Sequence, residues 1–186
     1  MARLRIDERF VLTWSERYLS EMDPEERARE DRLFLQVGSA VRAQGYFSRA
    51  QFLQVGEWKS PRSRSLYRRN TEAQVRTITA LALGSLVEER LSTLTALLGV
   101  QDAVASALLT VWDPERFTVT DWRARETLTR AGKFRTSGGR APYGLYLAVC
   151  RDIADGLDVS VGGISRLRRL DRALWKCSQA HGRIAR

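Results

Sequence analysis

Apolar residues recur every three or four positions along most of this chain, which is the spacing of helices with one buried face. The first series is Phe10, Trp14, Tyr18 and Met22. Later series predict helices over about 87–98, 102–112, 143–157 and 164–180. No region is rich in the alternation typical of strands, and no internal repeat is visible. The pattern therefore predicts an all-α fold.

Several predicted helices carry recognisable start and stop signals. Ser48 with Gln51, and Thr71 with Gln74, have the spacing of capping boxes. In such a box the hydroxyl and the glutamine side chain satisfy amide groups that the first turn leaves without partners. Gly45 is typical of a helix end, because glycine readily adopts the left-handed conformation there.

The length and the rare residue types limit the classes of protein to consider. The 186 residues give room for one domain, 1–186, or for two small helical lobes sharing one core. Two cysteines and one histidine make zinc sites and Ser-His-Asp or Cys-His catalysis improbable. The chain also lacks an export signal and an apolar stretch of membrane-spanning length. We therefore expect a soluble cytoplasmic protein with no membrane association and with reduced cysteines.

The charge is distributed unevenly along the chain. There are 31 basic and 22 acidic residues, which gives a net charge of +9. Residues 1–115 hold 16 of each sign, whereas residues 116–186 hold 15 basic and 6 acidic residues. Arginine supplies 28 of the basic residues, and its planar fork matches phosphate oxygens. A genome rich in G and C explains why arginine outnumbers lysine, but it does not explain why the excess of basic residues is confined to residues 116–186. The charge therefore favours nucleic-acid binding.

Two parts of the basic end are candidates for DNA contact. The loop 132–142 carries Lys133, Arg135 and Arg140 among three glycines and a proline. The last helix carries Arg166, Arg168 and Arg169, with Arg172 and Lys176, on the face opposite its leucines. A disordered basic loop and a solvated helix face are the alternative interpretations.

The most informative stretch runs from Leu94 to Leu128. It predicts a helical hairpin over about 87–112 that turns at Gly99, where glycine permits a positive φ. The start of the second helix turns its amide groups outward, and such helix ends bind phosphate. A further segment, about 117–130, contains Asp121 at a helix start, where aspartate is common as a cap.

These residues resemble the helix-hairpin-helix superfamily of base-excision DNA glycosylases, over about 35 residues. The family hairpin reads L-P-G-V-G, and the matching residues are Leu97, Leu98, Gly99, Val100 and Gln101. Ala105 matches the family's helical alanine, and Val119-Thr120-Asp121 matches the segment with the essential aspartate. Trp58–Arg62 and Asp113–Phe117 also look like uncharacterised bacterial relatives of these enzymes.

The resemblance implies a glycosylase-like helical domain with a basic C-terminal portion, binding double-stranded DNA through Leu98, Gly99, Val100 and Gln101. It implies a monomer associated with the bacterial nucleoid, which removes a damaged or modified base with Asp121 as the catalytic residue. No organic cofactor and no metal are implied, beyond a monovalent cation that such hairpins hold with backbone carbonyls. Bifunctional members carry a lysine where this chain has Ala103, so the resemblance implies base release without strand cleavage.

Two departures from the family pattern keep other functions open. Gln101 replaces a glycine, and Asp102 places a negative charge beside the phosphate-binding turn. These residues favour a DNA-binding protein of the same fold that has lost catalysis. A helical protein that binds another protein or an anionic membrane is a third alternative. The base and the lesion are not specified by the sequence.

The resemblance also suggests where the substrate base would lie. A flipped base needs an aromatic or apolar pocket, for which Trp58, Trp122 and Tyr143 are candidates, although tryptophans belong more often to the core. Lys59 and Arg62 lie where related folds approach the lesion.

Overall fold

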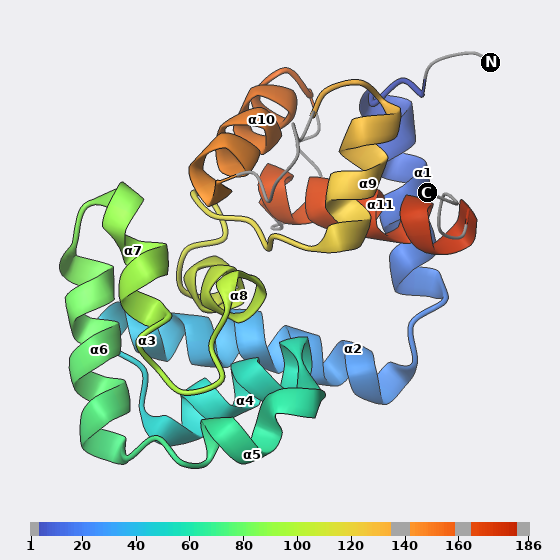
Figure 1. Cartoon of the computed structure of the whole chain (residues 1–186). Helices are drawn as coiled ribbons and strands as arrows, with labels where there is room; N and C mark the ends of the chain where they lie inside the picture. The colour runs from blue at the N-terminus through green and yellow to red at the C-terminus, as the bar shows by residue number, and fades with distance from the viewer. Residues whose placement is uncertain (1–3, 135–141, 159–164, 182–186) are drawn as a thin grey trace. The chain divides into compact units, whose positions relative to one another are not determined.

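The computed structural model describes residues 4–134, 142–158 and 165–181, and these residues are folded into helices without any strand (Figure 1). The prediction of an all-α fold is confirmed. The chain divides into two compact units, one formed by residues 24–119 and the other by residues 1–23 and 120–186. Within the described residues, none of the helices combines the length and the apolar composition that a membrane crossing requires.

The unit of residues 24–119 begins with one long helical segment. The segments α2 (Pro24–Asp31), η1 (Arg32–Val37) and α3 (Gly38–Gln44) follow each other without a break, and η1 has π-helical hydrogen bonding. Gly45 ends the segment at φ 78°, as its sequence position predicted. The remaining elements of this unit are α4 (Arg49–Lys59), η2 (Pro61–Ser63), α5 (Arg64–Tyr67), α6 (Glu72–Gly84), α7 (Val87–Leu94) and α8 (Asp102–Trp112).

Helix α8 forms the centre of this unit. It packs against α3, α4, α7 and η1, and every residue from Val104 to Val111 is buried. Its alanines allow close approach, and the neighbouring Gly38 lies so near the Val111 carbonyl oxygen that a Cβ atom would collide with it. Both predicted capping boxes are present, with Ser48 and Gln51 at α4 and Thr71 and Gln74 at α6. Local signals therefore define the helix starts, and small residues set the packing distance.

The other unit is built around its last helix, α11 (Arg166–His181). This helix packs against α1 (Glu8–Ser20), α9 (Trp122–Arg130) and α10 (Tyr143–Asp155). The Thr127 hydroxyl donates a hydrogen bond to the Leu174 carbonyl at 2.8 Å, which links α9 to α11. Neighbours on several sides leave α11 with little exposed surface.

The enclosure of α11 corrects one expectation from the sequence. The face carrying Arg168, Arg172 and Lys176 was expected to be exposed, but these three side chains are buried. Arg168 forms an ion pair with buried Asp171, and Lys176 lies 2.7 Å from Glu21 at the end of α1. The leucine pattern identified one packed face of α11, whereas the ion pair of Lys176 with Glu21 and the contacts of Arg168 and Arg172 with the Tyr18 ring occupy the other.

The buried ion pair predicts a stability difference between two arginines of α11. Replacing Arg168 by serine should lower the free energy of unfolding by about 3–5 kcal/mol, because the buried carboxylate of Asp171 would lose the positive charge of the guanidinium beside it. The matched control is Arg166→Ser, which removes an exposed arginine from the same helix and should change stability by less than about 0.5 kcal/mol. Urea denaturation of both variants measures the difference, and equal stabilities would contradict this role for Arg168.

Candidate nucleic-acid interface

The predicted hairpin is present in the unit of residues 24–119. Its first helix, α7, ends at Leu94 and not at residue 98, and a series of tight turns leads to α8. Gly99 has φ 83°, which few other residues adopt, and the Val100 amide donates to the Leu97 carbonyl at 3.1 Å. The turn at Gly99 therefore has the backbone conformation expected from the sequence.

A buried asparagine outside the hairpin fixes this turn. The Asn70 side-chain oxygen accepts a hydrogen bond from the Leu98 amide at 2.8 Å, and its nitrogen donates to the Leu98 carbonyl at 3.1 Å. The same nitrogen donates to the Tyr67 carbonyl at 3.0 Å, so the turn is attached to α5. Sequence reasoning missed Asn70, because nothing in the sequence connects it with a turn 28 residues away.

The first turn of α8 lacks a side-chain cap, as do the starts of α7 and α10, whereas four other helices have one. Asp7, Ser48, Thr71 and Asp121 each accept a hydrogen bond from the helix that follows them. Gln101 precedes α8 and makes no such side-chain bond, so the first amides of α8 lack this intramolecular acceptor. Uncapped amides at a helix start are suited to an anion such as phosphate. Asp102 in the first turn acts against an anion there.

Residues 61–70, the hairpin segment, contact the hairpin through Asn70 and carry four exposed arginines: Arg62, Arg64, Arg68 and Arg69. Arg49 fixes the backbone of this segment, since its guanidinium donates to the carbonyls of Arg68 and Asn70 at 2.8 Å each. Among the described residues, neither Arg62 nor Arg69 has a carboxylate partner. Their charges therefore add to the hairpin surface, and only Arg62 was identified from the sequence.

Asp121 lies in the other unit, directly before α9. It is half-buried, and its side-chain oxygen accepts a hydrogen bond from the Arg123 amide at 2.9 Å. The helix-cap interpretation of Asp121 is therefore seen directly in the structure. The hairpin and Asp121 belong to different units.

The candidate pocket aromatics are divided between the units. Trp58, at the end of α4, is half-buried and packs at 85° against Phe34 with 5.9 Å between ring centroids. Trp122 is 43% exposed beside the Arg123 guanidinium, whereas Tyr143 is buried. No single unit brings the three together.

The other predicted basic residues have varied surroundings. Lys59 is half-buried at the end of α4, Lys133 and Arg166 are exposed, and Arg169 is half-buried. Arg168 is buried and its guanidinium is paired with Asp171, so it does not form part of an exposed basic surface. Arg135 and Arg140 lie outside the described residues.

The two buried cysteines are poorly suited to act as nucleophiles. Burial raises the pKa of Cys150 to about 12, and burial also raises the pKa of Cys177. Thiols with raised pKa values are poor nucleophiles at neutral pH.

Burial, with a contribution from Arg116, lowers the pKa of Arg90, whose guanidinium lies 4.8 Å from the Trp112 ring centroid.

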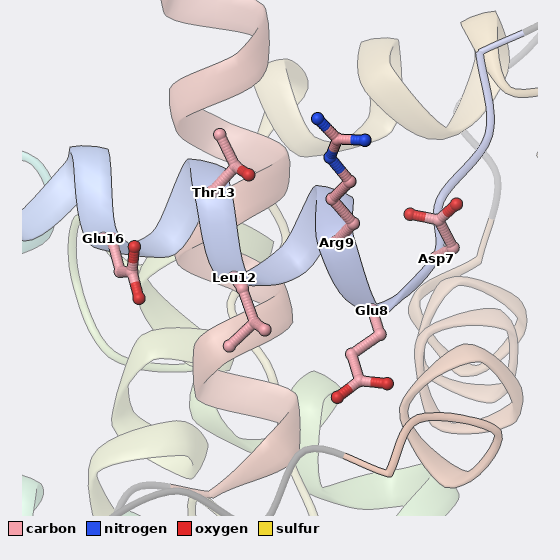
Figure 2. A pocket seen from close by; sticks show the side chains of 6 residues that line it. All are labelled: Asp7, Glu8, Arg9, Leu12, Thr13 and Glu16. Carbon is pink, nitrogen blue, oxygen red and sulfur yellow. The ribbon is translucent and has the colours of Figure 1, made fainter.

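One hollow follows α1 in the other unit, lined by Asp7, Glu8, Arg9, Leu12, Thr13 and Glu16. Figure 2 shows that these side chains do not converge: Glu8 and Leu12 extend from one side of α1, and Arg9 and Thr13 extend from the other. Three carboxylates against one guanidinium do not suit a phosphate group. This hollow is therefore not part of the candidate interface.

Comparison of the chain with family models, with curated proteins and with solved structures finds no match. The hairpin geometry and the resemblance in its sequence are accordingly the basis for the functional proposal.

The packing of Gly99 predicts that this glycine is required for folding of the hairpin. A Cβ atom at this position would lie 2.8 Å from the Leu66 Cβ and 3.0 Å from the Tyr67 ring. We expect Gly99→Val to lower the free energy of unfolding by at least about 1–3 kcal/mol, from backbone strain alone. In the control Gly84→Ala, a Cβ meets nothing within 4 Å, so stability should be unchanged or rise by about 0.5–1 kcal/mol. Thermal denaturation of both variants tests this, and a fully stable Gly99→Val protein would contradict it.

Proposed function

We propose that this chain binds double-stranded DNA through the turn between α7 and α8 and acts as a monofunctional DNA N-glycosylase. The observation that carries the proposal is the positive-φ turn at Gly99, which Asn70 holds directly before the uncapped start of α8. A backbone anchored in this way presents amides to a phosphate without having to be ordered on binding.

The neighbouring arginines support binding to a duplex backbone. Arg62 and Arg69 are exposed on the segment that Asn70 joins to the hairpin. Guanidinium groups form charge-assisted hydrogen bonds with phosphate oxygens. Contacts of this kind position a protein on DNA and contribute salt-dependent affinity without reading the sequence.

The proposed chemistry is hydrolysis of the bond between a base and its deoxyribose. Positive charge develops on the sugar in the transition state, as in glycoside hydrolysis. Asp121 is the proposed residue that stabilises this charge and orients water, and no cofactor is needed for that role. Ala103 occupies the position of the lysine in bifunctional relatives, so the proposed reaction leaves the strand intact.

A second candidate is a DNA-binding protein of the same kind without catalysis. The hydrogen bond from the Arg123 amide to Asp121 is compatible with it, because capping alone accounts for an aspartate at this position. Asp102 also lies in the first turn of α8, where a negative charge opposes tight phosphate binding.

Duplex binding should weaken as salt rises, and the arginines beside the hairpin should contribute to this dependence. Each phosphate contact adds about −0.9 to the slope of log affinity against log salt. The double variant Arg62→Ser/Arg69→Ser should therefore flatten the slope by up to about 2. Fluorescence anisotropy with a labelled duplex at several salt concentrations measures it.

The control for this experiment removes the same charge elsewhere. Arg9 and Arg27 are exposed and lie outside the hairpin segment, so Arg9→Ser/Arg27→Ser should leave the slope nearly unchanged. Equal slopes for the two double variants would show that the hairpin segment does not contact DNA.

The variant Asp121→Asn separates the two candidate functions. Asparagine keeps an oxygen that can accept from the Arg123 amide, so folding and DNA affinity should barely change. If the charge stabilises the transition state, base excision should fall by about 10²–10³-fold. The measurement uses duplexes with single modified bases, followed by alkali to reveal abasic sites.

Three results would change the proposal. Full activity of Asp121→Asn would restrict Asp121 to capping. A covalent adduct trapped with borohydride would require an amine nucleophile, with Lys59 the first to examine. Absence of base release by the wild-type protein across a broad panel of lesions would leave the non-catalytic candidate.

A further inference from the structure

A hollow of about 330 Å³ lies in the unit of residues 24–119, beside the segment of Arg62 to Arg69, since Pro61 and Arg64 are in its lining. The elements around it are α2, η1, α4, η2 and α5. It is lined by Arg29, Arg32, Leu33, Gln54, Glu57, Trp58, Pro61 and Arg64. Its volume is at the lower end of the range for small-molecule sites, about 300–1,000 Å³. A ligand of this site is therefore small, and a duplex does not fit in it.

One wall of the hollow is an aromatic ring held by its neighbours. Trp58 is half-buried and packs edge-to-face against Phe34, and the adjacent Leu33 is fully buried. A ring fixed in this way offers a rigid apolar surface at little entropic cost. Nucleobases stack on such rings with little dependence on their identity.

The rim of the hollow is positively charged. Arg29 and Arg32 are exposed, and neither has a carboxylate partner among the described residues. Glu57 is the one carboxylate in the lining, and it is already engaged by Arg64 at 2.7 Å and by Arg68 at 3.8 Å. With Arg64 paired to Glu57, the guanidinium groups of Arg29 and Arg32 give the lining a net positive charge, which suits an anionic ligand.

We propose that this hollow binds one phosphorylated nucleoside unit, with its base stacked on Trp58 and its phosphate held by Arg29 and Arg32. Either a free mononucleotide or an unpaired nucleotide at the end of a strand supplies this chemistry. The combination of one aromatic wall with separate guanidinium groups selects the nucleotide over a nucleoside or a phosphate alone. The site does not depend on the hairpin or on Asp121.

Isothermal titration calorimetry on the whole chain tests the assignment with four probes. They are deoxyadenosine monophosphate, deoxyadenosine, inorganic phosphate and a 5′-phosphorylated single strand of thymidines. The nucleotide should bind at least about tenfold more tightly than the nucleoside or phosphate, because it makes both kinds of contact. A single strand that binds more tightly than the nucleotide identifies a strand end as the source, and equal affinities identify the free nucleotide.

The variants examine the two halves of the site separately. Trp58→Leu should weaken nucleotide binding at least about fivefold, whereas Trp58→Phe should retain most of it. Arg29→Ser/Arg32→Ser should remove the preference for the nucleotide over the nucleoside. Arg27→Ser removes an exposed charge of α2 outside the hollow and should change affinity less than about twofold.

The proposal is overturned if nucleotide and phosphate bind equally, if none of the probes binds at millimolar concentration, or if the arginine pair and the Arg27 control behave alike. Duplex binding measured in parallel keeps the two proposals apart. Loss of duplex affinity in Arg62→Ser/Arg69→Ser with unchanged nucleotide binding would support both sites independently.

Discussion

The pair of hydrogen bonds between Asn70 and Leu98 is the interaction on which the hairpin depends. One buried side chain satisfies both the amide and the carbonyl of a residue in the turn, at 2.8 and 3.1 Å. Asn70 is buried, and a buried polar side chain left without partners costs about 1–3 kcal/mol, so the register of the turn against α5 is strongly fixed. This register also explains why position 99 is a glycine, because the turn passes so close to Leu66 and Tyr67 that a Cβ atom would collide with them.

The distribution of charge has a different meaning once the units are known. Residues 24–119 contain 13 basic and 11 acidic residues, whereas the other unit contains 18 and 11. The unit that holds the hairpin is therefore nearly neutral overall. The proposed binding of phosphate would therefore depend on local groups, namely the anchored amides and the exposed arginines. The basic unit directs several of its charges inward, since Arg168, Arg172 and Lys176 are buried against their own neighbours.

Local features of the fold were predictable from the sequence, and contacts distant in sequence were not. The capping boxes at Ser48 and Thr71 and the left-handed end at Gly45 depend on a few adjacent residues, so their chemistry is readable directly. The Asn70 contact joins positions 28 apart, and an asparagine before a helix start is unremarkable by itself. The apolar period of α11 likewise identified its leucine face.

The second packed face of α11 could not be read from that period. Arginine and lysine are usually exposed, and contacts that the period does not show, such as the ion pair of Arg168 with Asp171 and the approach of Lys176 to Glu21, accompany their burial here. The surroundings of the three candidate pocket aromatics could not be read from the sequence either. Trp58, Trp122 and Tyr143 share a residue class, but tertiary structure gave them three different environments.

The cap formed by Asp121 does not compete with a catalytic role. A cap needs one lone pair to accept the Arg123 amide, whereas stabilisation of a cationic transition state needs the net charge of the carboxylate. Electrostatic catalysis is effective when the charged group is held in place before the reaction, so that no energy is lost in orienting it. A hydrogen bond to the backbone at the start of α9 provides that constraint. The hydrogen bond that explains an aspartate at position 121 would therefore also hold its charge in place for the proposed reaction.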